Sequence, residues 1–156
     1  GSLSTYADVH ATTLGSTMGA ATRIEIISDR DLIIRANDLK DEIREVEEAL
    51  QKIDKVVATV KSQLAGSKEV LPEQMQYLKQ ATVNKPPLVK KLHQMREERE
   101  QLQSRVERNK NACIRVEGVI FSGVEIVVKD VRKIQHDQVS HCRFVRDGAD
   151  VRMVGL

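Results

Sequence analysis

The sequence has few aromatic and few cysteine residues, and each shortage excludes a class of protein. Aromatic side chains make up 3% of the chain, and tryptophan is absent. The two cysteines, Cys113 and Cys142, are too few for a disulfide scaffold or a closed zinc site. No apolar run approaches the roughly 20 residues that span a bilayer. The formal net charge of +2 gives no strong attraction to nucleic acid or anionic lipid.

The length and composition are those of a charged chain that folds. Its 156 residues suit one domain or two small ones, and its apolar fraction of 40% is too high for a disordered chain. A reducing cytoplasm is the expected compartment, because cysteines are few and the sequence shows no signal peptide. We expect Gly1-Ser2 to be left from tag removal and the chain to begin inside a larger protein, since strand-like residues 6–11 follow closely.

The central part of the chain carries a long heptad repeat. Apolar residues recur at alternating steps of four and three, which is the pattern of a coiled-coil seam. The seam consists of Leu32, Ala36, Leu39, Ile43, Val46, Leu50, Ile53, Val57, Val60 and Leu64. Asp29 or Asp31 suits the N-terminal end of this helix, and Gly66-Ser67 should end it.

A second seam follows in the return arm, with polar residues at some of its positions. It consists of Leu71, Gln74, Leu78, Ala81, Lys85, Leu88, Leu92, Met95, Arg99, Leu102 and Val106. Because proline removes a helical hydrogen bond and clashes with the preceding turn, Pro86-Pro87 predict a break at 84–87 and two return helices, about 73–83 and 87–110. The arms then have equal length, with the tip near 66–71. The outgoing arm is net acidic and the return arm net basic, which favours antiparallel pairing.

The two ends of the chain have strand character. Alternation predicts short strands at 114–117, 124–128 and 142–146, with turns at Gly118 and Gly123. Asp147-Gly148 predicts a hairpin between 141–146 and 149–154. The expected organisation is an N-terminal β segment at 1–28, a coiled-coil hairpin at 29–110, and a C-terminal β segment at 111–156 that packs with the first.

Residues 112–128 resemble the C-terminal strand motif of the flagellar assembly protein A family. The motif is an alternating strand, then glycine, two or three apolar or aromatic residues, a variable residue and Gly-Val. The matching positions are Gly118, Val119, Phe121, Gly123, Val124 and Ile126. Residues 15–26 are similar to the family's last rung before its coiled coil, and 144–151 to its closing hairpin. The family commonly has glycine where Ile27 and Ser28 stand.

The resemblance implies an α+β fold: a long antiparallel coiled-coil hairpin inserted in the C-terminal end of a right-handed parallel β-helix with short strands. It implies a bacterial cytoplasmic protein that supports flagellar assembly and motility, without enzymatic activity, catalytic residues or cofactors. The implied partners are proteins, namely flagellar assembly or cell-pole factors. Recruitment to the flagellar pole and self-association through the second seam stay open, and most of the β-helix would lie outside this chain.

Reactive side chains in the sequence form no familiar pattern. The spacing of His136, His141 and Cys142 matches no standard metal site, and neighbours in a strand point to opposite faces. Cys113 has no base nearby in the sequence, so a buried strand cysteine is the expected role. The stretch from Gly15 to Gly19 lacks the lysine of a phosphate-binding loop. We expect no metal site and no catalytic residue.

We therefore expect a non-catalytic scaffold that presents its hairpin to partner proteins. The candidate contacts are Gly66, Ser67, Lys68, Glu69, Val70 and Leu71 at the tip, and Lys85, Pro86 and Pro87 at the break. One alternative is a nucleic-acid-binding arm, although acidic residues interleave with the basic ones at 90–110 and no aromatic residue lies among them. A second alternative is the remnant of a β-helix enzyme.

Overall fold

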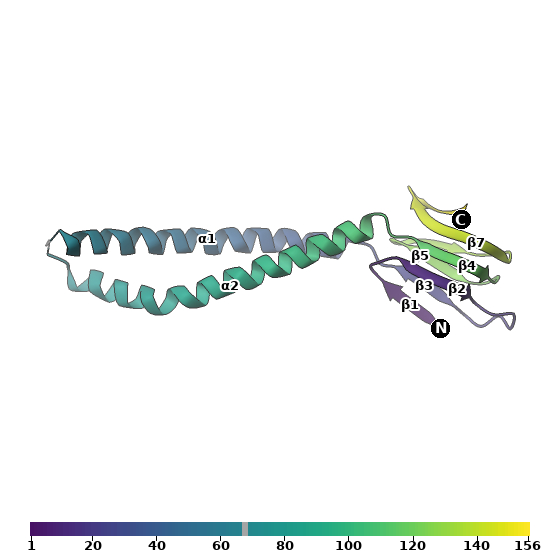
Figure 1. Ribbon diagram of the computed structural model, residues 1–156, viewed down its shortest axis with the longest axis horizontal. Helices are drawn as coiled ribbons and strands as arrows, with labels where there is room; N and C mark the ends of the chain where they lie inside the picture. Colours follow the sequence, from purple (N-terminus) through teal and green to yellow (C-terminus); the bar gives the residue numbers. More distant parts are fainter. Residues whose placement is uncertain (67–68) are drawn as a thin grey trace. The chain divides into compact units, whose positions relative to one another are not determined.

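A computed structural model describes residues 1–66 and 69–156, with eight strands and two long helices in that part of the chain (Figure 1). The strands are β1 Ser2–Thr5, β2 Val9–Leu14, β3 Arg23–Ile26, β4 Ile114–Ile120, β5 Glu125–Val128, β6 Val131–Ile134, β7 Val139–Asp147 and β8 Asp150–Gly155. The helices are α1 Arg30–Ala65 and α2 Pro72–Lys110. The chain divides into a β unit, Gly1–Ile34 with Leu102–Leu156, and a hairpin unit, Arg35–Gln101.

The β unit contains two four-stranded mixed sheets. Their strand orders are β1-β3-β5-β6 and β2-β4-β7-β8. The pairs β1/β3, β3/β5 and β2/β4 are parallel, whereas β5/β6, β4/β7 and β7/β8 are antiparallel. Ser2, expected to be a tag remnant outside the fold, begins β1 and pairs with Arg23.

The prediction of a right-handed parallel β-helix end is wrong. The sheets are mixed and do not coil into a solenoid. The reason lies in two tight hairpins. Val128 pairs with Val131, and Asp147 pairs with Asp150, so β6 and β8 run back antiparallel to the strands before them. In a parallel solenoid, each connection instead brings the chain back so that the next strand runs in the same direction as the strand beside it. The second hairpin confirms the one predicted between 141–146 and 149–154, although its loop is Gly148-Ala149 rather than Asp147-Gly148.

Both sheets contribute side chains to one hydrophobic core. Ile26 and Ile126 come from one sheet and Ile114 and Phe144 from the other, and all four are fully buried. Alternation places these residues on the inner faces, as expected for strands with one solvated side. Burying such a side chain stabilises the fold by about 1.5–3 kcal/mol, so this core holds the β unit together.

Gly118 lies inside β4, so the predicted turn at this position is wrong. The register between β4 and both of its neighbours shifts between Val116 and Val119. Two residues of β4 therefore face one residue of each neighbour, which is the arrangement of a β-bulge. A Cβ atom at Gly118 would lie 2.4 Å from the carbonyl oxygen of Thr12. The close approach of β2 to β4 therefore requires glycine.

The return arm is one continuous helix, so the predicted pair of return helices is wrong. Pro86 and Pro87 both lie within α2. Outgoing helix α1 begins at Arg30, and the carbonyl of Asp29 accepts from the Ile33 N–H, so Asp29 holds the N-cap position as one of the two predicted candidates. The Arg30 N–H donates to the hydroxyl of Ser28. It ends at Ala65, as the following Gly66 predicts. None of the helices in the described part of the chain is long and apolar enough to cross a membrane.

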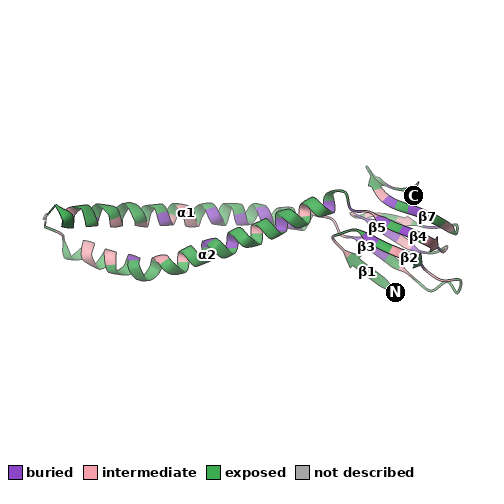
Figure 2. Cartoon of the chain, viewed as in Figure 1, coloured by how far each residue is buried: buried purple, intermediate pink, exposed green. Residues whose placement is uncertain are grey.

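Helices α1 and α2 pair antiparallel in the hairpin unit (Figure 1). The predicted seam is confirmed where Leu39, Ile43, Leu50 and Val60 are buried, while most other helical residues are exposed (Figure 2). Among the described residues, three ion pairs join the arms. They are Arg35 with Glu98 at 3.1 Å, Glu47 with Arg96 at 2.6 Å, and Asp54 with Lys85. Each exposed pair contributes only about 0–1 kcal/mol, so the seam is the main source of stability.

Candidate functional site

An apolar groove lies between the arms of the hairpin unit, near the end of α1 and the start of α2. Its volume is about 470 Å³. It is lined by Lys55, Val56, Thr59, Val60, Glu73, Gln74 and Tyr77. We call it the hairpin groove. Val56 is 39% exposed and Tyr77 is 36% exposed, whereas Val60 is buried. The groove therefore has a closed apolar floor and two accessible apolar side chains on its walls.

The prolines of α2 account for a bend in this helix. Pro86 and Pro87 have no N–H, so the carbonyls of Thr82 and Val83 lose their helical donors. Such a loss bends a helix, and Figure 1 shows that α2 is bent while α1 is nearly straight. The hairpin groove lies on the N-terminal side of these prolines along α2. The proline pair thus acts as a bend within a continuous helix rather than as the predicted break.

The described tip residues, Gly66 and Glu69 to Leu71, directly follow α1 or directly precede α2. The Gly66 N–H donates to the Ser62 carbonyl at 3.0 Å and closes α1. Glu69 is exposed and Val70 is half-buried. Leu71 is 59% exposed, and its N–H donates to the Gln74 side chain at 3.1 Å. The other two predicted tip contacts, Ser67 and Lys68, lie outside the described residues.

The predicted contacts near the prolines have different surroundings from those at the tip. Lys85 is half-buried and pairs with Asp54 across the hairpin. Pro86 and Pro87 are exposed on α2. None of these three residues lines the hairpin groove. Sequence reasoning missed Val56 and Tyr77, which do line it. The available signal was that both are large apolar side chains outside the heptad seam.

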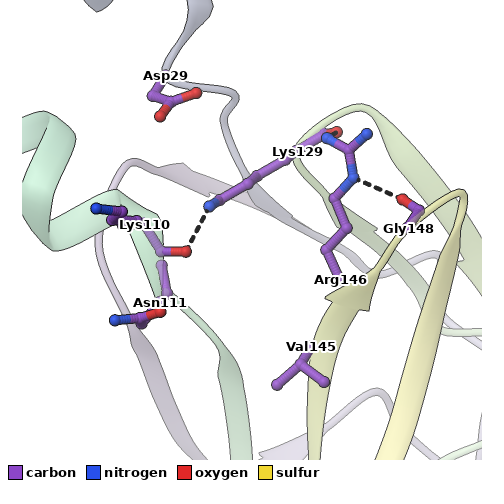
Figure 3. Close-up of a pocket in the computed structure, with 8 residues that line it drawn as sticks. Asp29, Lys110, Asn111, Lys129, Val145, Arg146 and Gly148 are labelled. Atoms are coloured by element: carbon purple, nitrogen blue, oxygen red, sulfur yellow. Dashed lines mark hydrogen bonds between the residues drawn. The ribbon is translucent and has the colours of Figure 1, made fainter.

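A second hollow lies in the β unit, with a volume of about 520 Å³ (Figure 3). It is lined by Asp29, Lys110, Asn111, Ala112, Lys129, Val145, Arg146 and Gly148. We call it the basic hollow, because three of its residues are cationic and only Asp29 is anionic. Sequence reasoning missed this site entirely. Its residues come from the start of α1, the end of α2, the β5–β6 turn and the β7–β8 hairpin.

Backbone acceptors hold two of the cationic side chains in place. The Lys129 ammonium donates to the Lys110 carbonyl at 2.9 Å, at the last residue of α2. Arg146 donates from Nε to the Gly148 carbonyl at 2.9 Å and from Nη1 to the Lys129 carbonyl at 2.8 Å. Figure 3 shows the bonds to Lys110 and Gly148. The two side chains are therefore linked through the backbone of Lys129.

The residues considered for metal or nucleophilic chemistry are dispersed. Cys142 belongs to the core, and its neighbour His141 is exposed. Among the described residues, no group of three His, Cys, Asp or Glu side chains could hold a metal ion. Burial raises the pKa of the Cys113 thiol, and the Asp8 carboxylate adds to the rise, while Arg143 and Arg115 oppose it. A raised pKa disfavours the thiolate that a nucleophile requires.

The fold and its sites define a small α+β protein whose two helices form a hairpin. The family model of the Flagellar Assembly Protein A beta solenoid domain matches residues 1–151. The chain belongs to this family, as the resemblance of residues 112–128 predicted, and the family implies a role in flagellar assembly. It is not a known enzyme family. No curated protein and no solved structure matches the chain.

Proposed function

We propose that this protein is a non-catalytic scaffold of flagellar assembly that presents the hairpin groove to a partner protein. The observation that carries the proposal is the pair of accessible apolar side chains, Val56 and Tyr77, beside a buried floor at Val60. Transferring each exposed apolar side chain from water into an interface is favourable by up to about 1.5–3 kcal/mol. A tyrosine in an apolar setting is also a common anchor of protein interfaces.

The charges beside the groove support a protein partner with an amphipathic surface. Lys55 and Glu73 lie at the wall of the groove, so both signs of charge are available to a polar rim. An apolar centre with a polar rim is the usual anatomy of a protein interface. The membership of the family supports the same conclusion, because assembly of a flagellum requires contacts between proteins.

The proposal also includes the surfaces that adjoin the groove. The exposed Leu71 and the other tip residues, together with Lys85, Pro86 and Pro87, are further candidate contacts, and the sheets of the β unit offer a second surface. We place the protein in the bacterial cytoplasm, with recruitment to the flagellar pole. Family membership supports this placement, since the parts of a flagellum are handled there before export.

The experiment replaces the groove side chains in the full chain in flagellated cells. Val56→Asp or Tyr77→Asp places a charge in the groove and should reduce the number of flagella per cell, counted by electron microscopy. Gln103→Asp is the matched control, because Gln103 is exposed on α2 and lies outside the groove and the other proposed contacts. Normal flagella in the two groove variants, at normal protein levels, would overturn the proposal.

A further inference from the structure

We propose that the basic hollow binds a small phosphorylated molecule, with its phosphate held by Lys129 and Arg146. The first support is charge. The hollow has three cationic residues and one anionic residue, Asp29, so its lining is net positive. A phosphate monoester carries about −1.5 to −2 charges at neutral pH and three strong acceptor oxygens. The ligand therefore matches both the sign and the donor-rich character of the lining.

The second support is the number of donors that the backbone contacts leave available. An ammonium group has three donors and a guanidinium group has five. Lys129 uses one of its donors on the Lys110 carbonyl, and Arg146 uses two, on the Gly148 and Lys129 carbonyls. The same contacts restrict both side chains before any ligand arrives. A site that is ordered in advance loses less entropy when it binds.

The third support is the backbone of the turn that carries Lys129. Lys129 has a φ of 49° and Asp130 a φ of 70°, and these two residues form the loop of the β5–β6 hairpin. Two-residue loops with positive φ at both positions favour Asn-Gly, because other side chains are strained there. The chain keeps a lysine at a position where asparagine would be less strained. Backbone strain of this kind is concentrated at functional sites.

The remaining lining residues indicate the rest of the ligand. A volume of about 520 Å³ lies within the range of small-molecule sites. Val145 and Ala112 give the hollow an apolar wall, and the Asp29 carboxylate can accept a hydrogen bond from a hydroxyl group. A phosphorylated sugar matches the cationic donors, the apolar wall and the Asp29 carboxylate of the hollow. Inorganic phosphate would meet only the cationic part of the site and would be repelled by Asp29.

The experiment titrates the full chain with ribose 5-phosphate and, separately, with inorganic phosphate. The readout is the shift of the backbone amide signals of Lys129, Arg146 and Gly148 in ¹⁵N–¹H NMR spectra at low salt. We expect saturable shifts with both probes and tighter binding of ribose 5-phosphate. Lys129→Asn and Arg146→Gln should each weaken binding at least about tenfold, since each removes a charged hydrogen-bond donor.

Two further variants test the effect of turn strain and the role of Asp29. Asp130→Gly relieves strain at the neighbouring turn position without touching the hollow, so it should leave binding unchanged. Asp29→Asn should bring the affinities of the two probes closer together by removing the repulsion of inorganic phosphate. The proposal is overturned if neither probe shifts these amides, if Lys129→Asn binds as well as the unaltered chain, or if inorganic phosphate binds more tightly than ribose 5-phosphate.

Discussion

The side-chain amide of Asn109 donates a 2.8 Å hydrogen bond to the backbone carbonyl of Ile27, although 82 residues separate them. Asn109 lies in the last turn of α2, and Ile27 lies just before α1. The same amide nitrogen donates to the Tyr6 carbonyl, also at 2.8 Å. Asn109 is fully buried at the position that continues the seam after Val106. One polar side chain thus ties both helix ends to the β1–β2 turn.

Asn109→Leu should therefore destabilise the protein. The substitution leaves the carbonyls of Tyr6 and Ile27 without their donor, and leaving a buried acceptor unpaired costs about 1–3 kcal/mol. We expect the free energy of unfolding, measured by urea denaturation, to fall by roughly 2–4 kcal/mol. Asn111→Leu, at an exposed position two residues further on, should change it little. Equal effects of the two substitutions would contradict this role of Asn109.

Gly118→Ala should destabilise the β unit. The added Cβ would lie 2.4 Å from the Thr12 carbonyl oxygen, so β2 and β4 must move apart. Overpacking of this kind costs about 1–3 kcal/mol, and thermal unfolding should shift to lower temperature. Gly155→Ala is the control, because nothing lies within 4 Å of its Cβ position. An unchanged melting temperature for Gly118→Ala would show that the bulge tolerates a side chain.

Replacing Pro86 and Pro87 by alanine should stabilise the hairpin unit and impair function. Alanine restores the N–H donors for the Thr82 and Val83 carbonyls, and a proline inside a helix costs about 3 kcal/mol or more. The melting temperature should rise while α2 straightens and the hairpin groove closes. The number of flagella should then fall in spite of the higher stability. A stabilised variant with normal flagella would show that flagellar assembly does not depend on the hairpin groove.

The thiol of Cys113 should react slowly with iodoacetamide at neutral pH. Burial and the Asp8 carboxylate raise its pKa, and only the thiolate is the nucleophile. The rate should therefore increase as pH rises through the raised pKa. Asp8→Asn removes one cause of the rise and should speed alkylation at constant pH, whereas Arg115→Gln should slow it. Mass spectrometry of the Cys113 peptide measures both rates, and the opposite order would contradict the assigned causes.

Local patterns in the sequence predicted the helical hairpin better than the β unit. The seam from Leu32 to Val60 follows from a repeat that needs only one partner helix. The turn residues Asp147-Gly148 likewise predicted a hairpin from local geometry. The β5–β6 hairpin was missed because its loop, Lys129-Asp130, lacks the usual Asn-Gly. The short, closely spaced strands suited either a small stack of sheets or the end of a β-solenoid, and the family resemblance favoured the solenoid.

The candidate sites were harder to predict, because they depend on departures from local rules. The hairpin groove lies beside a helix that continues through Pro86 and Pro87, where tertiary pairing overcomes their low helix propensity. The basic hollow brings together Lys129 from one sheet and Arg146 from the other, and their proximity depends on how the two sheets pack together. Lys129 belongs to no motif, and Arg146 lies in residues 144–151, which resemble a closing hairpin rather than a binding site.

The most direct test of the account is site-specific photo-cross-linking of the full chain in flagellated cells. A photoreactive residue at position 56 should form an adduct with a flagellar assembly protein, and Tyr77→Asp should abolish it. The same residue at position 103, which is exposed on α2 and lies outside the groove and the other proposed contacts, should not form the adduct. An identical adduct from position 103, or one from position 56 that persists with Tyr77→Asp, would contradict the hairpin groove as the binding surface.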